Sequence, residues 1–107
     1  MSKYLIKASY SAEGIKGVMA KGGSARVDAV QKALSGVGGS MDAMYFAFGG
    51  DDVFVIVDAP SHAAAAAFAG TVGGSGALSK YETVVLLTPE ELDEAAKLSV
   101  NYSPPGS

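Results

Sequence analysis

One stretch decides the fold: Gly49-Gly50-Asp51-Asp52-Val53-Phe54-Val55-Ile56-Val57. Its last five residues are all apolar, which is typical of a strand that is buried on both faces and central in a sheet. The four residues before them are types that a tight turn requires, because glycine supplies positive φ and aspartate tolerates it. The stretch therefore predicts a β-hairpin that leads into a central strand.

Three further segments are predicted to form strands of the same sheet, and the strand of residues 3–10 is expected to lie in the middle beside this one. Residues 3–10 alternate, with Tyr4, Ile6, Ala8 and Tyr10 on one side, which is the period-2 pattern of a strand. Residues 41–48 alternate in the same way and enter the hairpin from the other end. Residues 81–88 are predicted to form the last strand. The sequence therefore predicts four strands.

Helical patterns fill the gaps between these strands. Ile15, Val18 and Met19 fall at helical spacing, but nearby glycines predict a short or bent helix. A second stretch, for which Ser24 is the expected cap, ends at the glycines of 36–39. Ser61 opens an alanine-rich helix to about Thr71, and residues 88–91 form a capping box for a final helix to about residue 98.

The order βαββαβ predicts an α+β fold of the ferredoxin-like type: one antiparallel four-stranded sheet with helices on one face. We expect residues 1–99 to form a single domain and residues 100–107 a flexible tail. The other sheet face stays open, and either Val53, Val55 and Val57 or Phe54 and Ile56 would meet water there. Since 49% of the residues are hydrophobic and 18% charged, we expect a homodimer or higher oligomer formed through this face.

Composition excludes several classes of protein. The net charge of −3 and scattered Lys and Arg residues disfavour a nucleic-acid partner. The absence of cysteine excludes disulfides and thiolate metal sites. The longest alanine-rich apolar run, Ala63 to Ala69, is far short of the roughly 20 residues that a membrane span needs. Without a signal-peptide pattern, we expect a cytoplasmic protein.

Several side chains are candidates for chemistry. His62, the only histidine, could be a base or a haem ligand, but its alanine neighbours favour a surface residue. Tyr10, Tyr45 and Tyr81 could line a ligand cavity, or be core and interface residues. Arg26 could anchor an anionic ligand, although an ion pair with Asp28 or another surface carboxylate is the simpler interpretation.

No metal or cofactor site is predicted. Asp51 and Asp52 are expected to brace the hairpin rather than bind an ion. The glycine loop 73–76 precedes a strand and lacks the lysine of phosphate-binding loops. It is therefore interpreted as a plain connection.

A family resemblance covers nearly the whole chain. It rests on Glu13-Gly14-Ile15, Arg26, Gly38-Gly39, Tyr45, Gly49 to Asp52 and Pro60. In these residues the chain resembles the GYD domain family, although Asp51 stands where the eponymous motif has an aromatic residue. The resemblance implies a dimeric α/β-barrel, in which two sheets pack face to face. It implies no activity, because proteins of similar fold range from cofactor-free monooxygenases to haem degraders.

Two functions are consistent with these observations. The first is a non-catalytic homo-oligomeric module that binds a small ligand or assembles as a scaffold. The alternative is a cofactor-independent oxygenase or isomerase that acts on a small aromatic or enolisable substrate, with Tyr45, Tyr10 and His62 as candidate catalytic residues. A tyrosine-lined cavity with convergent polar groups would favour the enzyme.

Overall fold

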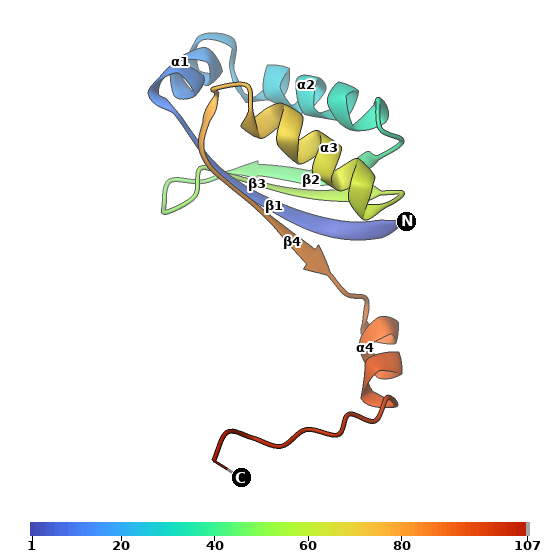
Figure 1. The fold of residues 1–107 in the computed structure, drawn as a ribbon. Helices are drawn as coiled ribbons and strands as arrows, with labels where there is room; N and C mark the ends of the chain where they lie inside the picture. Colours follow the sequence, from blue (N-terminus) through green and yellow to red (C-terminus); the bar gives the residue numbers. More distant parts are fainter. Residues whose placement is uncertain (107) are drawn as a thin grey trace.

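The computed structural model describes residues 1–106 and has the predicted ferredoxin-like fold (Figure 1). In chain order, the elements are β1 (Ser2–Tyr10), α1 (Ala12–Lys21), α2 (Gly23–Ser35), β2 (Ser40–Phe46), β3 (Val53–Ala59), α3 (His62–Gly73), β4 (Leu78–Leu86) and α4 (Pro89–Ala96). The strands form one antiparallel sheet in the order β2-β3-β1-β4. The predicted central position of β1 and β3 is therefore confirmed.

Capping side chains begin three of the helices as the residue types suggest. Ser11 accepts a hydrogen bond from the backbone N–H of Gly14 at the start of α1, and Ser61 accepts one from Ala64 at the start of α3. Thr88 and Glu91 form the predicted capping box of α4. Side-chain acceptors at these positions satisfy backbone donors that the helix itself leaves unpaired.

The predictions differ from the structure at several boundaries. Ser24 does not cap α2, because α1 and α2 are separated by Gly22 alone, whose φ of 85° lets the chain turn at once into the second helix. β2 ends at Phe46 rather than residue 48, and β4 begins at Leu78 rather than residue 81. The hairpin forms, but Gly49 and Gly50 are not among the described glycines with positive φ. A six-residue connection closed by the hydrogen bond from Ala47 N to Asp52 O replaces the tight turn.

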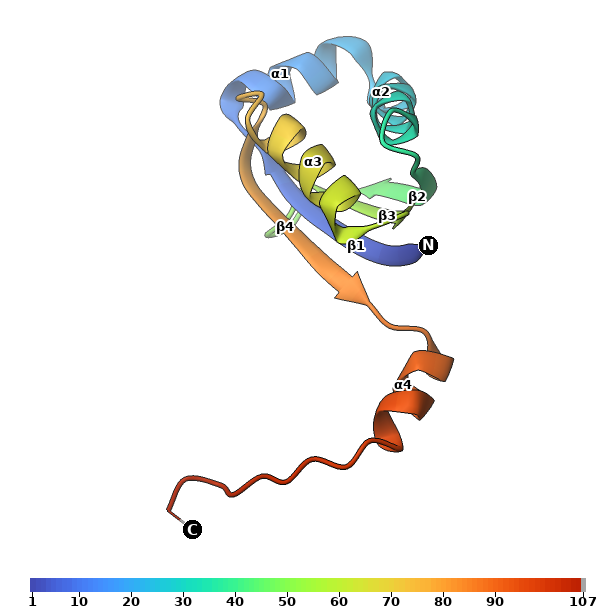
Figure 2. The same ribbon diagram turned by 45° about the vertical axis from the view of Figure 1, so that its right-hand side comes forward.

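The core lies between the sheet and the first three helices (Figures 1 and 2). Val53, Val55 and Val57 of β3 are buried on this side, together with Leu34 of α2 and Phe68 of α3. Because side chains alternate along a strand, Phe54 and Ile56 point to the opposite side, where they are only half-buried. In the single chain β3 is therefore buried on the helix side, and its other side belongs to the open face that the sequence predicts for a monomer.

The C-terminal arm, residues 87–106, leaves the body of the domain after β4. Figures 1 and 2 show α4 away from the other three helices. No residue of α4 is buried. The large apolar side chains of the arm are exposed: Leu87, Leu92, Leu98, Val100 and Tyr102. Within residues 1–106 no helix is long and apolar enough to cross a membrane.

Candidate functional site

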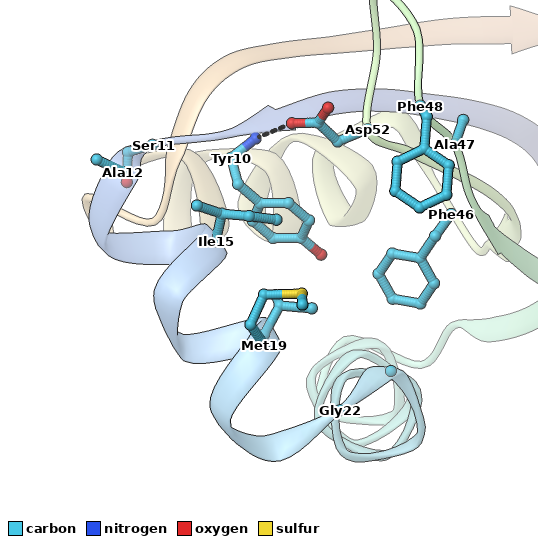
Figure 3. A pocket seen from close by; sticks show the side chains of 12 residues that line it. Tyr10, Ser11, Ala12, Ile15, Met19, Gly22, Phe46, Ala47, Phe48 and Asp52 are labelled. Carbon is cyan, nitrogen blue, oxygen red and sulfur yellow. Dashed lines mark hydrogen bonds between the residues drawn. The ribbon is translucent and has the colours of Figure 1, made fainter.

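A large cavity lies where β1 ends and the chain enters α1 (Figure 3). It has a volume of about 630 Å³. We call it the Tyr10 cleft; it is lined by Tyr10, Ser11, Ala12, Ile15, Val18, Met19, Gly22, Gly23, Phe46, Ala47, Phe48 and Asp52. Its size is within the usual range for a small-molecule site, and its walls are mainly apolar.

Local sequence shapes this cleft. The turn at Gly22 brings α2 next to α1, and Gly23 then lies against the ring of Phe46. A Cβ at Gly23 would lie 2.9 Å from Phe46 Cε2, so the absence of a side chain allows this close approach. On the opposite wall, the backbone N–H of Tyr10 donates to Asp52 Oδ2 at 2.9 Å, which ties the hairpin connection to the end of β1 (Figure 3).

Tyr10 is also a wall of a second, smaller cavity between the sheet and the helices. This Arg26 cavity has a volume of about 50 Å³, and its polar lining includes Arg26, Ser75 and Tyr81. Arg26 Nε and the Tyr81 hydroxyl are buried without a hydrogen-bond partner in the described part of the chain. Tyr10 and Tyr81, two of the three tyrosines predicted to line a cavity, therefore line one together with Arg26.

Burial controls the protonation of both tyrosines. It raises the pKa of Tyr10, and the nearby Arg26 guanidinium opposes that rise. Burial likewise raises the pKa of Tyr81. Both hydroxyls therefore keep their protons at neutral pH and can act as hydrogen-bond donors.

His62 lies at the other end of the sheet. The Tyr4 hydroxyl is 2.6 Å from His62 Nδ1, and the two rings meet edge to face with centroids 5.8 Å apart. Tyr4 and Tyr10 are six positions apart in β1, which corresponds to about 20 Å along a strand. His62 is exposed on the first turn of α3. It is therefore not part of the Tyr10 cleft.

Tyr45 lies on the opposite side of the sheet from Tyr10. It pairs with Phe54 in the register of β2 and β3, so it shares the face that no helix covers, and it is 70% exposed. The structure does not bring Tyr10, Tyr45 and His62 together in one pocket. This separation follows from the strand alternation, which places residues 44 and 46 of β2 on the core side.

Asp51 and Arg26 are the remaining candidate residues, and their charged neighbours differ. Asp51 lies within ion-pair distance of Lys80 at 3.3 Å and of Lys7 at 3.9 Å, so ion pairs link the hairpin connection to β4 and β1. Arg26 has no ion pair with Asp28 among the described residues. Within residues 1–106, no group of three His, Asp or Glu side chains could hold a metal ion.

Sequence reasoning missed two parts of these sites. Tyr4 is predicted to lie on the same side of its strand as Tyr10, but it was not connected with His62, 58 positions away. The apolar walls of the cleft were also missed, because Met19 and Phe46 are far apart in the chain and line one cleft only after the helices pack on the sheet. Strand alternation indicated that Tyr4 and Tyr10 share a face, but it could not show which helix residues would meet them.

Comparisons with known proteins agree with this architecture. The model of the GYD domain family matches residues 4–96. A solved structure described as "crystal structure of FFRP-DM1" is similar, with a TM-score of 0.56 and 16% sequence identity, and the alignment covers 81% of this chain and 100% of that one. At this identity the likeness concerns the fold alone. The search of curated proteins finds no match. With a family match over most of its length, the chain belongs to the GYD domain family.

Proposed function

We propose that this chain is a non-catalytic homo-oligomeric module that assembles through its uncovered sheet face. The observation that carries the proposal is the apolar centre of that face. Leu5 of β1 pairs with Ile56 on one side and with Val84 on the other, so the three side chains lie next to one another. Phe54 and Leu86 extend the patch, which we call the open face.

Charged side chains frame the open face. Lys3 contacts Asp42 and Asp58 at one end. Lys7 lies 3.5 Å from Glu82 toward the other end. An apolar centre with a polar rim is the usual anatomy of a protein interface. These local charge pairs also leave little unbalanced charge to repel a second copy.

The exposed area supports the same proposal. The chain exposes 7042 Å², whereas a folded monomer of its mass exposes about 5,500 Å². The excess of about 1,500 Å² exceeds the roughly 800 Å² that each partner contributes to a standard interface. The radius of gyration is 16.9 Å, compared with about 13 Å for a compact chain of this length.

The C-terminal arm accounts for part of this excess. Its exposed Leu92 and Leu98 have no core of their own to pack on. An amphipathic helix gains most of its stability from packing an apolar face. We therefore expect α4 to pack against a second copy, in an assembly of the dimeric α/β-barrel type in which two open faces meet.

Light scattering of the full chain at micromolar concentration tests the assembly. We expect a dimer or a larger oligomer, and a shift toward monomer in Ile56→Glu, which places a charge at the centre of the open face. Ala33→Glu, on the exposed side of α2, is the matched control and should leave the mass unchanged. Circular dichroism checks that both variants fold. A monodisperse wild-type monomer would overturn the proposal.

A cofactor-independent oxygenase or isomerase is the second candidate. The Tyr10 cleft favours it, because its volume suits a small aromatic substrate and a phenol hydroxyl lies beside it. Such a reaction needs a positioned base. His62 is hydrogen-bonded to Tyr4 at the other end of β1, and Asp52 in the cleft already accepts a backbone hydrogen bond. The geometry therefore supports binding in the cleft better than catalysis.

A further inference from the structure

Asp52 places a carboxylate on the wall of the Tyr10 cleft. Its Oδ2 accepts the backbone N–H of Tyr10, but none of the ion pairs among residues 1–106 involves it. Its chain neighbour Asp51, by contrast, lies within ion-pair distance of Lys7 and Lys80. A charge in largely apolar surroundings is stabilised by an opposite charge nearby. The Asp52 carboxylate can therefore accept a cation from outside the chain.

The backbone holds Asp52 in place. Its N–H donates to Ala8 O at 2.9 Å, and its carbonyl oxygen accepts from Ala47 N at 2.8 Å. Together with the side-chain hydrogen bond to Tyr10, these contacts fix the residue to β1 and to the chain that follows β2. A group that is already positioned loses little conformational entropy when it binds a ligand.

The other residues of the cleft wall carry no charge. Apart from Asp52 the lining consists of apolar, hydroxyl and glycine residues. Tyr10 keeps its proton at neutral pH, because burial raises its pKa. Arg26 lines the Arg26 cavity and not the cleft, and its Nε is buried. An anion in the cleft would therefore meet the like charge of Asp52, whereas a cation is attracted to it.

Three aromatic rings face the same space. Tyr10, Phe46 and Phe48 project into the cleft from β1, from β2 and from the connection that follows β2, as Figure 3 shows. Met19 is 79% exposed and Phe48 is fully exposed, so both have apolar surface left to cover. The faces of aromatic rings attract cations within about 6 Å of the ring centre. A cation that carries alkyl groups would also remove this apolar surface from water.

We propose that the Tyr10 cleft binds a small quaternary ammonium ion. The positive charge pairs with Asp52, and the alkyl groups pack against the aromatic rings and Met19. Unsubstituted ammonium and metal ions are disfavoured, because the apolar walls cannot replace the water that these ions hold. The cleft is built from the end of β1, α1 and the start of α2 on the helix side of the sheet. Binding there does not depend on assembly through the open face.

NMR titration of the isotope-labelled full chain with choline tests this proposal. The signals to follow are the Met19 methyl group and the backbone amides of Phe48 and Asp52. The alcohol 3,3-dimethylbutan-1-ol has the same shape without the charge, and ammonium chloride supplies the charge without the alkyl groups. We expect choline to bind about tenfold more tightly than the alcohol, because only choline gains both the ion pair and the attraction to the rings. Ammonium should cause no shifts in the cleft.

Two variants separate the charge from the rings. Asp52→Asn removes the charge but keeps an oxygen that can accept the Tyr10 N–H; it should weaken choline binding about threefold and leave the alcohol unaffected. Asp28→Asn changes an exposed aspartate of α2 outside the cleft and should alter neither affinity. Phe48→Leu should weaken choline binding about threefold. Tyr102→Leu, in the exposed C-terminal arm, should leave it unchanged.

Circular dichroism checks the fold of each variant. If Asp52→Asn does not fold, Phe48→Leu carries the test, because its ring is fully exposed and contributes nothing to the core. Equal affinities for choline and the alcohol would overturn the proposal and would indicate a site for neutral ligands. Unchanged choline affinity in folded Asp52→Asn, or no shifts in the cleft at high millimolar choline, would overturn it as well. Light scattering of the same samples reports assembly independently, so a failure of binding is distinguishable from a failure to assemble.

Discussion

Gly14 lies against the backbone of Ala77, so that a Cβ at Gly14 would lie 2.0 Å from the Ala77 carbonyl oxygen. This contact joins the first turn of α1 to the segment that leads into β4. The hydrogen bond from Ser11 N to Ala77 O, at 2.8 Å, lies beside it. Together they fix the end of β1, and with it the position of Tyr10.

Gly14→Ala is therefore expected to destabilise the protein, because the added methyl group meets backbone that cannot rotate away. Overpacking of this kind costs about 1–3 kcal/mol. Gly17→Ala is the matched control in the same helix, since its Cβ would meet nothing within 4 Å; it should stabilise by up to about 1 kcal/mol. Urea unfolding at one protein concentration measures both. Equal stability of the two variants would contradict the close contact.

Tyr4 and His62 are expected to be energetically coupled. The Tyr4 hydroxyl is buried with its residue, which is 2% exposed, and His62 Nδ1 is its partner at 2.6 Å. A double-mutant cycle with Tyr4→Phe and His62→Ala should give a coupling energy of about 0.5–1.5 kcal/mol. Tyr102→Phe alters an exposed tyrosine and is the control. Its free energy of unfolding should stay within about 0.5 kcal/mol of that of the parent protein. Strict additivity of Tyr4→Phe and His62→Ala would show that the hydrogen bond contributes nothing.

Asp42 is expected to titrate below its ordinary range, because the hydrogen bond from the Lys3 ammonium lowers its pKa. A carboxyl whose folded pKa is lowered stabilises the fold above its unfolded pKa of about 3.9, and this contribution is lost as pH falls through the folded pKa. The pair is exposed, so the effect on stability is small and decreases with salt.

Carbon-detected NMR of the carboxyl groups measures this pKa directly. Lys3→Met should raise the Asp42 pKa toward its ordinary range, because it removes the hydrogen bond that lowers it most. Lys16→Met is the control and should leave the Asp42 pKa unchanged. Lys16 is exposed, lines neither the Tyr10 cleft nor the Arg26 cavity, and pairs with none of the described carboxylates. An unchanged Asp42 pKa in Lys3→Met would rule out Lys3 as the cause.

The sequence by itself determined the strands, the starts of three of the four helices and the order of the elements. Val53 to Val57 indicated a central strand because an unbroken apolar run has no other stable place in a small domain. Thr88 and Glu91 indicated a helix start because capping is a contact between residues three apart. Both signals are local, so neighbouring residues suffice to read them.

Only the tertiary structure decided which face of the sheet is covered and which side chains meet. Both faces of β3 are apolar, so its pattern left open whether the valines or Phe54 and Ile56 would face the helices. The convergence of Arg26 and Tyr81 beside Tyr10 depends on how α2 packs against the sheet. Such contacts join residues far apart in the chain, and their positions are set by the packing of whole elements rather than by local propensity.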